Sequence, residues 1–169
     1  MDFLLRSVIA GLMAAFLHEV GHFIVARLLV RLPVHRLTFG MGKQLLAFKL
    51  KETEIEFCVF PFGGQIYILP EHIKNLARHK IALVSAGGFL TNIMLAISAS
   101  WFWSHPLAKL FLILNVIVAI SCLLPDRGKS DGERMLAFLT GREVFLKADR
   151  ENADINKAVL ASIQAKFTD

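Results

Sequence analysis

Two histidines and a glutamate near the start of the chain form the first candidate site. The run His18-Glu19-Val20-Gly21-His22 lies inside a hydrophobic stretch. On a helix, residues four apart project from one face, so both imidazoles could bind one Zn²⁺. Glu19 follows the first histidine, where a carboxylate can polarise a water molecule and carry its proton to a leaving amine. The spacing therefore predicts a zinc site with ligands His18 and His22 and the acid/base catalyst Glu19.

Chance is the alternative explanation for this pattern. Three specified residues at fixed spacing arise in a chain of this size on the order of one time in a hundred. The surroundings favour function, because ionisable groups inside an apolar helix are costly to bury without partners. We therefore expect a bound metal.

A third ligand is expected, because a catalytic zinc usually takes three protein ligands and leaves one position open. Asp131 is the leading candidate, since Pro125 and two glycines precede or adjoin it and let the backbone leave helical geometry. The alternative role for Asp131 is the N-cap of a helix that begins near Glu133. Asp126 is a weaker competitor for the metal. Surface charge is the ordinary explanation for the remaining acidic residues between the first two spans, Glu52, Glu54, Glu56 and Glu71.

The elements that carry these residues are hydrophobic enough to cross a membrane. The chain is 55% hydrophobic and only 20% charged, with a mean hydropathy of +0.55, which is more apolar than a soluble domain of this length needs to be. Three spans are predicted, at Phe3–Val30, Ile81–Trp103 and Leu110–Leu124. The third is short, so either Leu107 to Lys109 extend it or the stretch after Pro125 stays at membrane depth.

Between the first and second spans, the sequence predicts β-structure. Three segments alternate or carry β-branched and aromatic residues, and glycines separate them, including the pair Gly63-Gly64. The expected strands are Leu37–Met41, Gln44–Lys51 and Thr53–Phe60. The predicted fold is thus a mainly α membrane protein, with a three-transmembrane-helix core and a small membrane-associated β-sheet between the first and second helices. Residues 1–140 would form this core, and residues 141–169 a polar C-terminal helix or tail.

The distribution of basic residues predicts the orientation. The segment between the first two spans carries eight lysines and arginines, whereas the link between the second and third offers only Lys109. Basic residues favour the cytoplasmic side. We expect a multi-pass protein of the cell membrane with its N-terminus outside and its C-terminus in the cytoplasm. Cys58 and Cys122 show no spacing motif, so buried thiols are favoured over a disulfide.

Four motifs in order resemble the site-2 protease family of intramembrane zinc metalloproteases, in its bacterial, minimal-core form. Phe16 to Phe23 resembles the family's HExGH helix, and Phe39 to Gly42 followed by Phe60 to Gly64 is similar to its β-sheet and Pro-x-Gly-Gly turn. Ser85 to Asn92 resembles its Ala-Gly-Pro-x-x-Asn helix, and Leu124 to Gly132 its Asn-x-x-Pro...Asp-Gly motif.

The resemblance implies an intramembrane zinc metalloprotease that hydrolyses peptide bonds of a membrane-tethered protein substrate. His18, His22 and Asp131 would hold Zn²⁺ and Glu19 would be the acid/base. The strands would present an extended substrate, with Gly63, Gly64 and Asn92 as its contacts. A regulatory membrane protein would be a further partner, and no nucleic-acid partner is expected.

Three departures from the family pattern keep an alternative open. Gly88 stands where the family usually has proline, Cys122 where it usually has asparagine, and the interval from Pro125 to Asp131 is one residue longer than is common. The family asparagine is thought to assist substrate or oxyanion binding, and Asn92 or Asn115 could take that role. The alternative is a non-catalytic membrane relative that keeps the fold for regulation or binding. A zinc transporter is less favoured, because the chain offers no repeat for alternating access.

Overall fold

The structure is a computed structural model that describes residues 2–74, 76–124 and 130–140. The predicted C-terminal helix or tail at residues 141–169 and the competing acid Asp126 lie outside the described residues.

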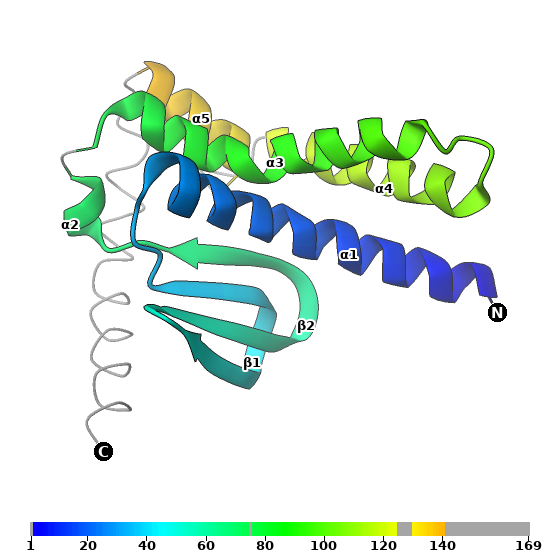
Figure 1. Cartoon of the computed structure of the whole chain (residues 1–169), viewed down its shortest axis with the longest axis horizontal. Coiled ribbons are helices and arrows are strands. Elements are labelled where there is room, and N and C mark those ends of the chain that lie inside the picture. The colour runs from blue at the N-terminus through cyan, green and yellow to red at the C-terminus, as the bar shows by residue number, and fades with distance from the viewer. Residues whose placement is uncertain (1, 75, 125–129, 141–169) are drawn as a thin grey trace.

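Three long helices form the body of the molecule (Figure 1). They are α1 (Asp2–Ile24), which continues as the π-helical segment η1 (Val25–Val30), α3 (Arg78–Ser100) and α4 (Pro106–Leu123). Each is long and apolar enough to cross a membrane, which confirms the three predicted spans. The helix bounds differ from the prediction in the second span, because α3 begins at Arg78 and Trp101 follows its end.

The start of α4 resolves the short third span. Pro106 occupies the first turn, where its missing N–H costs nothing, and the His105 side chain accepts a hydrogen bond from the Leu107 N–H at 3.3 Å. Leu107 to Lys109 therefore belong to α4, which confirms the alternative in which these residues lengthen the third span.

A β-hairpin lies beside α1, between the first and second spans (Figure 1). Its strands are β1 (Arg36–Leu50) and β2 (Thr53–Tyr67), paired antiparallel. The hairpin confirms the predicted sheet. The prediction of three short strands is wrong, because one continuous strand, β1, replaces the first two of them. Leu37 pairs with both Ile55 and Ile66, so two stretches of β2 flank the first half of β1. Gly63-Gly64 lies within β2 and does not end a strand.

Two shorter helices complete the described fold, namely α2 (Pro70–Ile73) and α5 (Asp131–Thr140). Helix α5 packs against α3 at the end of the bundle that is far from the N-terminus (Figure 1). The Ser130 hydroxyl accepts a hydrogen bond from the Glu133 N–H at 3.3 Å. Ser130 is thus the N-cap of α5, which corrects the alternative that gave this role to Asp131.

Helices α1 and α3 cross most closely at glycines. A Cβ added at Gly21 would collide with the Thr91 hydroxyl and would lie 2.6 Å from the Gly87 carbonyl oxygen. Small residues are what allows membrane helices to approach closely, because lipid supplies little hydrophobic drive for association. The contact fixes the turn of α1 that carries His22 against α3.

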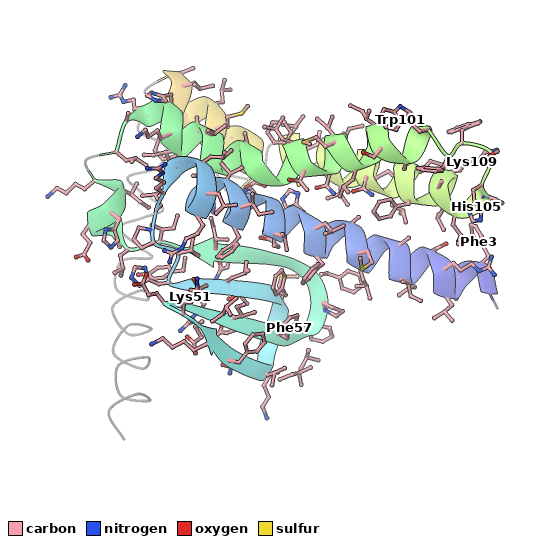
Figure 2. The ribbon with its side chains drawn as sticks, viewed as in Figure 1. Phe3, Lys51, Phe57, Trp101, His105 and Lys109 are labelled. Carbon is pink, nitrogen blue, oxygen red and sulfur yellow. The ribbon has the colours of Figure 1, made fainter. Side chains whose placement is uncertain are left out.

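The end of the bundle that carries the N-terminus is exposed and aromatic (Figure 1, Figure 2). Figure 2 shows Phe3, Trp101, His105 and Lys109 together at this end, and Phe3 and Trp101 are largely exposed. The Lys109 ammonium lies 5.0 Å from the centre of the Trp103 ring, a cation–π geometry. Aromatic and basic side chains of this kind are typical of a membrane–water interface.

The prediction that all acidic residues between the first two spans are surface charges is wrong for two residues of the sheet. Glu54 and Glu56 are buried. Arg36 approaches Glu54 at 3.2 Å and Glu56 at 3.5 Å, and the Thr38 hydroxyl donates to Glu56 at 3.2 Å. Buried carboxylates need such partners, and β1 supplies them because it pairs with the stretch of β2 that carries both acids.

Candidate metal centre

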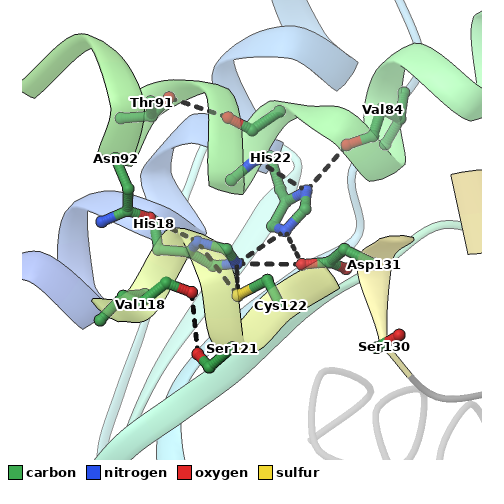
Figure 3. A network of polar contacts seen from close by, with 12 residues as sticks. His18, His22, Val84, Thr91, Asn92, Val118, Ser121, Cys122, Ser130 and Asp131 are labelled. Carbon is green, nitrogen blue, oxygen red and sulfur yellow. Dashed lines mark hydrogen bonds and ion pairs between the residues drawn. The ribbon is translucent and has the colours of Figure 1, made fainter. Parts of the chain in front are cut away.

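His18, His22 and Asp131 converge although they come from opposite ends of the described chain (Figure 3). The Nε2 atoms of the two histidines are 3.2 Å apart, and each lies 3.0 Å from the same Asp131 carboxylate oxygen. Helix α1 presents the histidines on one face, and α5 begins at Asp131 and points its carboxylate at them. The three residues that the sequence singled out therefore share one point in space.

The other nitrogen of each imidazole is held by an acceptor. His18 Nδ1 lies 2.6 Å from the Asn92 side-chain oxygen, and His22 Nδ1 lies 2.8 Å from the Val84 backbone carbonyl oxygen and 3.3 Å from the Gly88 backbone nitrogen. The oxygen acceptors are the nearest partners of both Nδ1 atoms, so they favour a proton on Nδ1, which would leave each Nε2 lone pair free to bind a metal. This arrangement is the usual one for histidines that bind a metal.

Asn92, which was expected to contact substrate, lies in the interior of the helix bundle. Its side chain is completely buried, and its amide donates to the Ala14 carbonyl at 3.1 Å and to Asn115 at 2.8 Å. Asn92 thus lies behind His18 and links α1, α3 and α4. Sequence reasoning missed this contact, although an asparagine inside an apolar helix is a signal for a buried polar partner.

The residues at the convergence point suit zinc. Two imidazole nitrogens and a carboxylate oxygen are ordinary zinc ligands, and tetrahedral coordination separates such donors by about 3.3 Å. Gly88 keeps the space beside them open, because a Cβ at this position would be closer than van der Waals contact to both Nε2 atoms.

A cavity of about 540 Å³ opens onto this point. Glu19, Gly63 and Gly64 line it together with the two histidines and Asp131. A Cβ at Gly64 would lie 2.7 Å from Glu19 Cγ, so only glycine lets β2 pass so close to this carboxylate. The predicted acid/base residue and the predicted glycine pair therefore face the same cavity.

Cys122 is an addition that sequence reasoning did not place at the metal. Its sulfur lies beside the His18 ring, 3.7 Å from Nε2 and 3.9 Å from Nδ1, and donor atoms of His18, Cys122 and Asp131 all lie within 4.8 Å of one another. The only sequence signal was its departure from the asparagine of the family pattern.

Comparison with known proteins gives a family match. The sequence model of peptidase family M50 matches residues 7–105, more than half of the chain. The match includes His18, Glu19, His22, the hairpin and Asn92, and it ends before Cys122 and Asp131.

Bacterial relatives carry names that describe candidate zinc metalloproteases. One from Helicobacter pylori strain J99 is 30% identical over 196 residues, covering 96% of this chain and 55% of the relative. One from Fusobacterium nucleatum is 40% identical over 68 residues, covering 40% of this chain and 20% of the relative. A third, from Clostridium perfringens, is 33% identical over 86 residues, covering 46% and 25%. The chain spans about half or less of the length of these relatives.

Proposed function

The chain belongs to peptidase family M50, and we propose that it is a zinc endopeptidase that hydrolyses peptide bonds of a membrane-tethered protein within or beside the bilayer. One observation carries the proposal. The Nε2 atoms of His18 and His22 and the carboxylate of Asp131 meet within 3.2 Å of one another, in a cavity that Glu19 also lines.

Each residue has a distinct role in this proposal. His18, His22 and Asp131 hold the zinc ion, and Asn92 orients the His18 ring through Nδ1. When bound, zinc supplies a Lewis acid that activates water at neutral pH. Glu19 accepts a proton from the attacking water and delivers it to the leaving amine nitrogen. Glu19 is buried and lines the same cavity as His18, His22 and Asp131, where a substrate would be hydrolysed.

Strand β2 would present the substrate. A peptide bond in a transmembrane helix is hydrogen-bonded and shielded, so the substrate must unwind locally, and pairing with a strand can satisfy its freed backbone groups. The stretch of β2 from Gly63 to Ile66 lines the cavity. Since this stretch also passes Glu19 at Gly64, a substrate strand beside it would carry its backbone past the carboxylate.

The chain would lie in a bacterial cell membrane with its N-terminus outside and its C-terminus in the cytoplasm, and residues 1–140 would form the catalytic unit, with residues 141–169 as a separate polar segment. Three candidate spans support a multi-pass arrangement. The excess of lysine and arginine between the first two spans supports the orientation. A regulatory membrane protein remains a further proposed partner.

The test is Glu19→Gln, assayed in detergent and in liposomes against a library of transmembrane peptides. Loss of the acid/base should lower kcat by roughly 10² to 10⁴ while zinc stays bound, because Glu19 is not a ligand. Glu71→Gln is the control, since Glu71 is well exposed on α2. Undiminished cleavage by Glu19→Gln would exclude the assigned role.

The alternative function is a non-catalytic membrane relative, and the observation that favours it is Cys122 beside the His18 ring, at the position where the family pattern has asparagine. The same preparation separates the two. A wild-type protein with one zinc per chain and no cleavage of any membrane-tethered peptide would support the binding role. His18→Ala should remove the zinc in either case.

A further inference from the structure

We propose that Ser85 is a further catalytic residue, whose hydroxyl donates a hydrogen bond to the carbonyl oxygen of the peptide bond that is cleaved. The inference rests on the proposed endopeptidase function and deepens it, because it names the group that would meet the oxygen on which negative charge develops. One observation carries it. The Ser85 side chain is buried and lines the cavity of the candidate metal centre, and its hydroxyl makes no hydrogen bond with any of the described residues.

The position of Ser85 on α3 turns it toward the metal centre. The residue before it, Val84, places its carbonyl oxygen 2.8 Å from His22 Nδ1. The residue three places after it, Gly88, is where an added Cβ would touch the Nε2 atoms of both histidines. Residues three apart share one face of a helix. Ser85 and Gly88 therefore face the same region, and Ser85 lines the cavity of about 540 Å³ together with both histidines.

The Ser85 hydroxyl is available to a ligand. Ser85 is 8% exposed, and buried polar side chains of native proteins nearly always have a hydrogen-bond partner. Two other serines that line this cavity follow that rule. Ser121 donates to the Val118 carbonyl at 2.8 Å, and Ser130 donates to Glu133 at 3.2 Å. Among the described serines of the cavity, Ser85 alone keeps its donor for a bound molecule.

The two asparagines considered above for oxyanion binding are used elsewhere. Asn92 and Asn115 are fully buried. The Asn92 amide donates to the Ala14 carbonyl at 3.1 Å and to Asn115 at 2.8 Å. The Asn115 amide donates to a backbone carbonyl of its own helix at 2.8 Å. Cys122, at the position of the family asparagine, offers only a weak S–H donor. Ser85 supplies an O–H donor that is not engaged in this way.

A donor at this place would act mainly in the transition state. Attack by water on the scissile carbonyl carbon moves the electron pair of the carbonyl π bond onto its oxygen. A hydroxyl already directed at that oxygen stabilises the developing negative charge more than it stabilises the neutral carbonyl. When the C–N bond breaks, the carbonyl re-forms and the proton held by Glu19 goes to the amine nitrogen. Ser85 keeps its own proton throughout, so it is neither nucleophile nor acid.

Ser85→Ala in the zinc-loaded full chain tests the inference against the same transmembrane peptides. Loss of one donor to the oxyanion should lower kcat by roughly 10². KM should stay within about twofold of wild type, because the lost bond belongs to the transition state. Ser85→Thr keeps the hydroxyl and should recover most of the loss. Ser98→Ala is the control on the same helix, since the Ser98 hydroxyl donates to the Met94 carbonyl at 2.9 Å. Zinc content should be equal in all of these proteins.

Binding of a phosphinic peptide gives a second measurement that needs no turnover. Such a peptide carries an anionic oxygen where the transition state has its oxyanion. A hydrogen bond to a charged group contributes enough that the Kd of the phosphinic peptide should rise about tenfold or more in Ser85→Ala. The Kd should not change in Ser98→Ala.

The outcomes separate this inference from the proposed function. Wild-type kcat and wild-type affinity for the phosphinic peptide in Ser85→Ala would overturn the role of Ser85 and leave the endopeptidase standing. Loss of zinc from Ser85→Ala in step with its loss of activity would also overturn it, because that result indicates a structural role. A wild-type protein that binds the phosphinic peptide through Ser85 but cleaves no peptide would overturn the proposed function alone. Failure of the zinc-loaded wild type to bind or cleave any of these peptides would overturn both.

Discussion

The same three helices behave differently at their two ends. Toward the end near α5, polar side chains are fully buried, with Asn92 and Asn115 0% exposed. At the other end, Phe3 is 75% and Trp101 82% exposed. A water-soluble protein has the reverse pattern. The contrast shows what holds the helices together. Lipid contributes little to helix association, so close-packed glycines and a network of hydrogen bonds hold the helices together near the site.

The network at the site end joins all three spans. His18 on α1 donates to Asn92 on α3, which donates to Asn115 on α4, which donates to the Phe111 carbonyl at 2.8 Å. Hydrogen bonds thus join α1 to α3 and α3 to α4, so the bonds that would orient His18 as a metal ligand also hold the helices together. Function and stability therefore depend on the same residues at this end and are separate at the other.

Among substitutions that test the difference between the two ends, Gly21→Ala should change stability most. The new Cβ meets the Gly87 carbonyl at 2.6 Å and the Thr91 hydroxyl, and overpacking against backbone should lower the free energy of unfolding by about 3 kcal/mol. Gly11→Ala in the same helix is the matched control, because nothing lies within 4 Å of its Cβ position. It should raise stability by up to about 1 kcal/mol. Denaturation in mixed micelles measures the free energy of unfolding of both variants. Equal changes in Gly21→Ala and Gly11→Ala would contradict the claim that close packing at glycines matters only near the site.

A smaller effect is expected from Asn92→Ala. The change leaves the His18 Nδ1 proton and the Ala14 carbonyl without this partner. We expect zinc affinity to fall by about 10- to 100-fold, as for other residues that orient metal-binding histidines. Ser98→Ala is the control on the same helix, since the Ser98 hydroxyl bonds only locally to Met94. Chelator competition is the measurement, and unchanged affinity in Asn92→Ala would show that His18 is oriented by something else.

The smallest effect is expected from Met94→Ala, on the outward face of α3. Met94 is 68% exposed, so the free energy of unfolding in detergent should change by no more than about 0.5 kcal/mol. A loss above about 1 kcal/mol would show that this face is packed against protein, which would contradict its assignment as lipid-facing. The same micelle denaturation assay serves here.

The sequence predicted the three spans and the common face of the two histidines, because both depend on local patterns. Hydrophobic length identified α1, α3 and α4, and the four-residue spacing of His18 and His22 fixed their common face. What depends on long-range pairing could not be predicted. The buried pairs of Arg36 with Glu54 and Glu56 arise only because β2 folds around β1. Likewise, the role of Asn92 follows from its depth in α3 relative to His18, which no local pattern specifies.

The order in which the ligand-bearing segments are synthesised limits when the proposed zinc site can exist. Asp131 follows His22 by 109 residues, an interval that takes a ribosome roughly 5 to 20 seconds to translate. During that time the first span is in the membrane with two histidines and no carboxylate to complete their set. A nascent chain that ends before Asp131 would therefore lack one member of the proposed ligand set, so the proposed zinc site could form only after the third span has been made.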